Sequence, residues 1–296
     1  MYTIGIDIGG TNFRIGLIDE EYNLSCFEKI SQGDLLNGDS PSKLAEFIKD
    51  YIKRNNVEKE IAAVCVGFPA TVDKTRSIVL NAPNIMGFNN VNVKQELSKR
   101  LDFPVFIEKD VNILITYDLY QYNIPVDCTV AAYYVGTGLG NAIYINNKLI
   151  SGDNGVAGEL GHIPAMNAQH TCNCGNKGCV EPLVGGMALK HLIDTNFKET
   201  HISDIFTKHG NDPLIDQYLE NLAVPLAAEI NIIDPTYIII GGGVVGMKDF
   251  PRERLERHIR NYVRKPLPEK NIKFIFTDSG ENSVIGAGIY SFKKLQ

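Results

Sequence analysis

The sequence contains the same small pattern twice, in which two apolar runs are joined by a glycine-rich turn. In the first copy, residues 2–7 and 13–18 flank the turn at 8–12, and in the second, residues 130–135 and 141–146 flank 136–140. Short apolar runs separated by glycines predict β-hairpins. Their repetition indicates two similar domains, each opening with a hairpin.

Helical and strand-like patterns alternate around the two hairpins. Ser40 and Pro41 suit the N-cap and first position of a helix. The other expected helices cover residues 111–122, 214–232, 252–263 and 283–294, and Pro225 is expected to kink or break the second of them. Buried strands are expected over residues 61–67, 104–107, 237–240 and 272–276. This alternation indicates an α/β fold with two sheets.

The same pattern predicts the division of the chain into domains. We expect a smaller N-terminal domain over residues 1–115 and a larger domain over residues 116–282. The last helix, residues 283–296, is expected to pack back on the first domain.

Composition excludes several classes of protein. The 296 residues suffice for two cores, the formal net charge is −6, and no basic run stands out, which argues against nucleic acid as a partner. No apolar segment approaches the roughly 20 residues of a membrane span. The N-terminus runs directly into the first expected strand, so no signal peptide is expected. Together with the scattered Cys26, Cys65 and Cys128, these features predict a cytoplasmic protein that binds neither nucleic acid nor membrane.

The segment from residue 159 to residue 181 concentrates metal-binding side chains. One imidazole and three thiols fall within 18 residues: His162, Cys172, Cys174 and Cys179. Such a set forms a complete tetrahedral zinc site, and Gly175 and Gly178 would let the loop turn tightly. A cluster of free or disulfide-bonded cysteines is the alternative, but the spacing favours zinc. Because Glu159 and Glu181 flank the cluster, a metal here would fix a polar site.

Three glycine-rich turns could approach phosphate groups closely. The first follows Asp7, a carboxylate that could hold Mg²⁺ through water, and contains Gly9, Gly10, Thr11 and Asn12. The second could form an anion-binding nest and contains Gly136, Thr137, Gly138 and Gly140. It lies between two strands rather than before a helix, so it is not a dinucleotide-binding fingerprint. The third, at an expected helix start, suits a nucleoside and contains Gly241, Gly242 and Gly243. Each could also be an ordinary turn.

A carboxylate follows the expected strand at residues 104–107. Asp110 in this place could accept a proton from an alcohol, as the general base of a phosphoryl transfer. It could equally serve only to cap the helix that follows. The residues alone do not separate these two roles.

Taken together, the motifs resemble the ROK family of sugar kinases and repressors, within the actin-like ATPase superfamily. The resemblance covers nearly the whole chain. It rests on D-I-G-G-T-N (7–12), G-F-P-A (67–70), A-P-N (82–84), D-V-N (110–112), G-T-G-L-G (136–140), G-E-L-G-H (158–162) and C-N-C-G-N-K-G-C-V-E (172–181). It implies an α/β fold with two actin-like (ribonuclease H-like) domains, a cleft between them and a zinc-binding loop.

The resemblance also implies an activity and roles for residues. The expected reaction is ATP-dependent phosphorylation of a hexose at its 6-hydroxyl, with Asp110 as the catalytic base and Mg²⁺ bound with ATP. The glycine turns would bind ATP, and a structural Zn²⁺ would be bound by His162 and the three cysteines of its segment. A homodimer is expected. The sugar would be bound by Asn84, Asp110, Glu159, His162 and Glu181.

One position departs from the family pattern. Lys109 stands where the family usually has an asparagine that touches the sugar, and we expect the lysine side chain to point away. With its other short motifs, such as F-P-R-E and R-K-P-L-P, the chain most resembles the D-allose kinases of the family, so D-allose is the expected substrate. A glucokinase, a fructokinase or an N-acetylmannosamine kinase is the alternative.

Two non-enzymatic functions are less consistent with the motifs. A sugar-sensing repressor of this family would carry an N-terminal helix-turn-helix domain, and only six residues precede Asp7. A sugar-binding regulator without activity would not need both the glycine hairpins and Asp110. We therefore expect a kinase.

Overall fold

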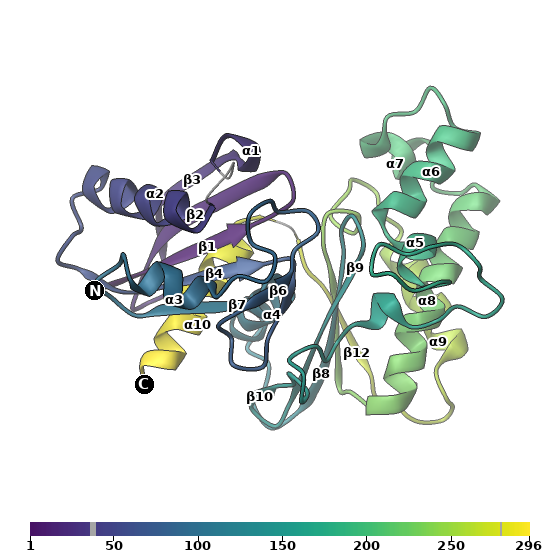
Figure 1. Ribbon diagram of the computed structural model, residues 1–296. Coiled ribbons are helices and arrows are strands. Elements are labelled where there is room, and N and C mark those ends of the chain that lie inside the picture. The colour runs from purple at the N-terminus through teal and green to yellow at the C-terminus, as the bar shows by residue number, and fades with distance from the viewer. Residues whose placement is uncertain (36–39, 279) are drawn as a thin grey trace. The chain divides into compact units, whose positions relative to one another are not determined.

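The computed structural model describes residues 1–35, 40–278 and 280–296, and the chain forms two compact units (Figure 1). The first unit comprises Met1–Ile124, Ser151–Ala157 and Gly280–Gln296, and the second comprises Pro125–Ile150 and Gly158–Ser279. Among the helices of the described residues, none is both long and apolar enough to cross a membrane.

The first unit is built on a five-stranded sheet in the order β3-β2-β1-β4-β7. β1 and β2 form the predicted antiparallel hairpin, and β4 and β7 extend the sheet in parallel. β5 and β6 form a separate small sheet. The strands are β1 (Tyr2–Ile8), β2 (Asn12–Asp19), β3 (Leu24–Ser31), β4 (Ile61–Phe68), β5 (Thr71–Val72), β6 (Val79–Asn81) and β7 (Val105–Lys109).

Helices of the first unit bury apolar side chains against this sheet. The helices of this unit are α1 (Gln32–Leu35), α2 (Ser40–Arg54), α3 (Val93–Ser98), α4 (Asp110–Gln121) and α10 (Asn282–Leu295). The apolar stripe of α2 is buried in one core with the inward residues of β1, since Leu44, Ile48 and Tyr51 are fully buried. Burying apolar side chains of this size is worth roughly 1.5–3 kcal/mol each, which stabilises the packing of α2.

The last helix packs against elements from the first part of the chain. α10, yellow in Figure 1, packs against β1, β4 and α4. The approach to α4 depends on Gly286, because a Cβ at this position would collide with the carbonyl oxygen of Ile113. The expected division after residue 115 falls inside α4, and because this helix packs on α10, the first unit continues to Ile124.

The second unit repeats the sheet of the first. Its order is β10-β9-β8-β11-β12, with β8 and β9 as an antiparallel hairpin and β11 and β12 parallel to β8. The internal duplication predicted from the two hairpins is therefore confirmed by the topology. The strands are β8 (Thr129–Val135), β9 (Leu139–Ile145), β10 (Lys148–Leu149), β11 (Tyr237–Gly241) and β12 (Lys273–Phe276).

Two local features of the second unit differ from expectation. Of the kink or break expected at Pro225, the break does not occur, since α8 continues through this residue. Apolar neighbours such as Leu222 and Leu226 are fully buried, and their packing outweighs the hydrogen bond that proline cannot donate. The triple glycine does not open a helix: Gly241 ends β11, turns follow, and α9 begins only at Arg252. The helices here are α5 (Glu181–Val184), α6 (Gly186–Asn196), α7 (Ile205–His209), α8 (Pro213–Ile233) and α9 (Arg252–Tyr262), with short 3₁₀ turns at Leu160–His162 and Ile202–Asp204.

Candidate active site

Asp110 is the first residue of α4, directly after β7. Lys109 occupies the N-cap position with extended backbone and makes no side-chain cap, while Oδ1 of Asp110 accepts a hydrogen bond of 2.8 Å from the backbone N–H of Val111. The side chain of Asp110 is half-buried. Asp110 is thus at the carboxyl end of a parallel strand, where ligands of α/β sheets bind.

The lysine beside Asp110 is buried. Lys109 is 6% exposed, and its Nζ lies 3.5 Å from the carbonyl oxygen of Ala157 in the first unit. Its charge is therefore not a solvated surface charge. Ala157 is followed directly by Gly158 and Glu159, the start of the G-E-L-G-H motif.

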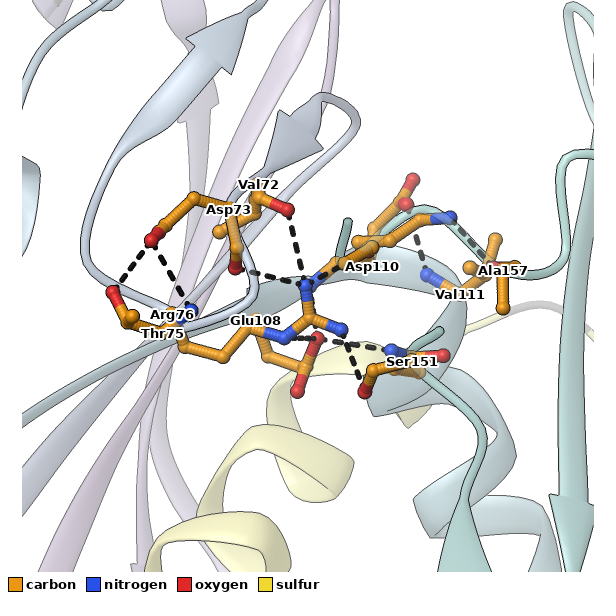
Figure 2. Close-up of polar contacts among 12 residues, drawn as sticks. Val72, Asp73, Thr75, Arg76, Glu108, Asp110, Val111, Ser151 and Ala157 are labelled. Atoms are coloured by element: carbon orange, nitrogen blue, oxygen red, sulfur yellow. Dashed lines mark hydrogen bonds and ion pairs between the residues drawn. The ribbon is translucent and has the colours of Figure 1, made fainter. Parts of the chain in front are cut away.

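Sequence reasoning missed a charged cluster next to the junction of β7 and α4. A single oxygen of Glu108, Oε1, accepts hydrogen bonds from the backbone N–H of Lys109 and from Nδ2 of Asn112, each at 2.9 Å. Nε of Arg76 pairs with the same oxygen at 2.9 Å (Figure 2). The one signal in the sequence is a glutamate at the end of an otherwise apolar strand, where an unpaired charge would be costly.

The first glycine turn lies next to Asn84, a residue predicted to bind the sugar. Gly9 closes the turn by donating its N–H to the carbonyl of Asn12 at 2.8 Å, and Gly10 at the tip is exposed. A Cβ added to Gly10 would lie 3.6 Å from Cβ of Asn84. The structure therefore brings the predicted phosphate turn and Asn84 together within the first unit.

Asp7, the expected magnesium ligand, has protein partners. Its Oδ2 accepts hydrogen bonds from Nη1 of Arg14 at 2.7 Å and from Oγ of Ser283 at 2.8 Å. Sequence reasoning singled out neither partner. Ser283 comes from α10, at the other end of the chain. The two bonds fix the carboxylate at the base of the turn.

The second glycine turn contacts Glu181. Oε2 of Glu181 accepts a hydrogen bond of 3.0 Å from the backbone N–H of Leu139, and a Cβ added to Gly138 would collide with that oxygen. A Cβ added to Gly161 would lie 3.3 Å from the same atom. The G-T-G-L-G turn, the G-E-L-G-H motif and Glu181 thus meet in the second unit.

The third turn is a neighbour of the second. Val244 donates its N–H to the carbonyl of Val135 at 2.9 Å. Gly242 has φ of +96°, and a Cβ there would lie 2.6 Å from the backbone of Val135. Both predicted nucleotide turns of the second unit therefore lie at the end of β8, although the third precedes no helix.

His162 faces two groups at once. Its Nδ1 lies 3.7 Å from Sγ of Cys172, and its Nε2 lies 3.8 Å from Oε2 of Glu159. The two nitrogens of one imidazole can act separately, one as a metal ligand and the other as a hydrogen-bonding group. The predicted double role of His162 is compatible with this orientation.

The three thiols and His162 fit a zinc ion. One ligand atom from each residue lies within 4.8 Å of all the others. Sγ of Cys174 and Sγ of Cys179 are 3.6 Å apart, far longer than a disulfide and close to the roughly 3.8 Å expected between ligands at zinc–sulfur distances of about 2.3 Å. Burial and the neighbouring thiols raise the pKa of Cys179, so the thiolate form of this side chain is disfavoured. A bound cation would stabilise that thiolate.

The backbone of this loop has the expected shape. Gly175 and Gly178 have φ of +94° and +72°, values that other residues rarely adopt. His170, which sequence reasoning did not single out, supports the loop through a 2.8 Å contact between its Nε2 and the carbonyl of Cys179.

Comparisons with known proteins agree with these motifs. The glucokinase of Thermotoga maritima is 27% identical over 261 residues, which cover 81% of each chain. The N-acetyl-D-glucosamine kinase of Salmonella typhimurium is 26% identical over 286 residues, covering 90% of this chain and 93% of that protein. The crystal structure of a ROK family glucokinase from Streptomyces griseus in complex with glucose and AMPPNP superposes with a TM-score of 0.81 at 26% identity, covering 99% of this chain and 100% of that one.

The family assignment rests on the match over the whole length. The family model described as ROK family matches residues 3–293, which includes all three glycine turns, Asp110 and the cysteine loop. This chain belongs to the ROK family.

Proposed function

We propose that this protein is an ATP-dependent hexose kinase that phosphorylates the 6-hydroxyl of its substrate, with D-allose as the preferred hexose. The observation that carries the proposal is the position of Asp110, a half-buried carboxylate at the first residue of α4, directly after β7. Relatives along the whole chain support the kinase reaction, since they include glucokinases, one of them crystallised with glucose and AMPPNP.

Asp110 acts as the general base in this proposal. Its carboxylate takes the proton of the 6-hydroxyl as that oxygen attacks the γ-phosphorus of ATP, and ADP leaves. Phosphoryl transfer requires little covalent chemistry from the protein, so positioning and charge neutralisation supply most of the rate. Backbone N–H groups of the glycine turns bind the phosphates, and Mg²⁺ bound with ATP neutralises their charge.

The remaining polar residues bind the sugar. Asn84, Glu159, His162 and Glu181 hydrogen-bond the ring hydroxyls, and the N–H of Leu139 orients the Glu181 carboxylate. His162 and the three thiolates would hold Zn²⁺, which would supply a structural cross-link that orders the segment between Glu159 and Glu181. With four protein ligands such an ion would be structural rather than an activator of water.

The choice of D-allose depends on the motifs of the chain and on Lys109. Lysine cannot supply the paired donor and acceptor of the asparagine that the family usually has there. Buried against Ala157, Lys109 leaves a differently shaped site for the ring hydroxyls.

A coupled assay of ADP release tests the proposal. The panel comprises D-allose, D-glucose, D-mannose, D-fructose, N-acetyl-D-mannosamine and N-acetyl-D-glucosamine, each with ATP and Mg²⁺. We expect the highest kcat/KM with D-allose. A higher value for another hexose would reject D-allose, and no hexose-dependent ADP release would reject the kinase.

A further inference from the structure

Arg76 adopts an unusual backbone conformation. Its φ is +54°, in the left-handed region that side chains other than those of glycine, asparagine and aspartate seldom occupy. It closes the turn after β5 by donating its N–H to the carbonyl of Asp73 at 3.0 Å. Strained residues of this kind persist where the surrounding structure fixes them, and they concentrate at functional sites.

The guanidinium of Arg76 is directed into the first unit. Its side chain is 13% exposed, and its ion-pair partner Glu108 is 4% exposed. Nη1 donates to the carbonyls of Val72 at 3.2 Å and Gly155 at 3.1 Å, and Nη2 donates to Oγ of Ser151 at 3.1 Å. Figure 2 shows the guanidinium between Val72, Glu108 and Ser151. One side chain thus joins the turn after β5, the end of β7 and the segment Ser151–Ala157.

Glu108 transmits this contact to both sides of Asp110. The oxygen that pairs with Arg76 also accepts from the backbone N–H of Lys109, the residue before Asp110, and from Nδ2 of Asn112, two residues after it. Lys109 provides a second link to the same segment through the carbonyl of Ala157. The buried ion pair between Arg76 and Glu108 therefore fixes the start of α4.

We propose that Arg76 is a positioning residue for phosphoryl transfer: through Glu108 it fixes the place of Asp110, and through Ser151 and Gly155 it fixes the segment Ser151–Ala157 to the same junction. The inference rests on the proposed function, in which Asp110 is the base. Lysine cannot replace Arg76, because an ammonium has no planar fork that could reach these acceptors together.

A double-mutant cycle between Arg76 and Asp110 tests this role. Arg76→Lys, Asp110→Asn and the double variant are assayed with D-allose and ATP, well below the melting temperature of the least stable variant. Arg76→Lys alone should lower kcat by about 10- to 100-fold, because small displacements of a reacting group have effects of this size. The KM for ATP should stay within about two-fold. In the Asp110→Asn background the same substitution should lower the residual kcat by less than about three-fold, since the base is already lost.

The controls separate positioning from general destabilisation. Arg100→Lys changes an arginine that pairs with Glu96 on α3 and should leave kcat unchanged. If Arg76→Lys does not fold, Ser151→Ala removes only the Nη2 acceptor and should lower kcat several-fold with the same non-additivity. Wild-type kcat in the folded variant, or losses that multiply in the double variant, would overturn the positioning role alone. Normal turnover of Asp110→Asn would overturn the proposed function, and the inference with it.

Discussion

Leu139 donates its backbone N–H to Oε2 of Glu181 at 3.0 Å, so a glycine turn predicted to bind phosphate orients a carboxylate predicted to bind sugar. The contact exists because the residue before Leu139 is glycine, which leaves room for the carboxylate. Hydrogen bonds to charged groups are worth about 1.5–3 kcal/mol, enough to define one orientation of Glu181.

Gly138→Ala should therefore weaken hexose binding. The added Cβ would collide with the end of a flexible side chain, so Glu181 is displaced while the backbone stays in place. We expect the Kd for D-allose, measured by calorimetry without nucleotide, to rise about 10-fold or more. The melting temperature should change by only a few degrees. Gly33→Ala, at an exposed position where a Cβ has space, is the matched control. Unchanged affinity in Gly138→Ala would show that Glu181 does not bind the sugar.

Lys109→Asn should shift selectivity from D-allose towards D-glucose. The substitution removes the buried ammonium near Ala157 and restores the family's paired amide donor and acceptor. One well-placed contact is worth about 1–3 kcal/mol when its absence leaves a polar group unpaired, so the ratio of kcat/KM values should change at least several-fold. Both sugars are measured below saturation, with Lys99→Asn at the C-cap of α3 as the control. A constant ratio would assign specificity to other loops, such as that of Asn84.

Loss of the metal should lower stability and sugar affinity together. Cys174 is exposed, so Cys174→Ala removes little packing and acts chiefly by opening the four-ligand set. We expect a lower melting temperature, a raised Kd for D-allose and substoichiometric zinc by elemental analysis. Cys26→Ser changes an exposed cysteine outside the cluster and should resemble the wild type. Purified wild-type protein without zinc, or wild-type behaviour of Cys174→Ala, would contradict the structural zinc site.

Glu229 should make the second unit less stable as pH rises. Burial raises the pKa of its carboxyl, against the opposing hydrogen bonds from Tyr133 and Asn141. The folded state then binds the proton more tightly than the unfolded state, so stability falls as pH rises from the unfolded pKa through the folded pKa. Glu229→Gln stays neutral, and its free energy of unfolding relative to wild type should increase between about pH 4 and pH 7.

Urea titrations across that pH range measure this difference. Glu58→Gln, at an exposed site, is the matched control. A pH-independent difference for Glu229→Gln would mean that Glu229 does not titrate differently in the folded state.

The parts of the fold that the sequence predicts are those with strong local signals. The two hairpins combine apolar runs with glycines, and α2 carries a regular apolar stripe, so their residues alone indicate their conformation. The sequence does not predict β3 (Leu24–Ser31), because half of its residues are polar and all of them are at least partly exposed. Its strand conformation follows from pairing with β2, a contact that local pattern does not encode.

The candidate site shows the same difference between local signals and contacts that distant segments make. The glycine turns and the thiol cluster could be located because their chemistry lies within short segments. Arg76 could not, because its partners Glu108, Ser151 and Gly155 lie far along the chain and meet only in the folded first unit. Ser283 on Asp7 is a second example, since it comes from α10.

Turnover of Asp110→Asn tests the central claim most directly. Asparagine keeps the size of the side chain and an oxygen for the N–H of Val111, but it cannot take the proton of the 6-hydroxyl. With D-allose, ATP and Mg²⁺, ADP release should fall by about 10²–10⁴-fold, while D-allose binding by calorimetry stays largely unchanged. Near-normal kcat in this variant would contradict the assignment of Asp110 as the general base and, with it, the proposed mechanism.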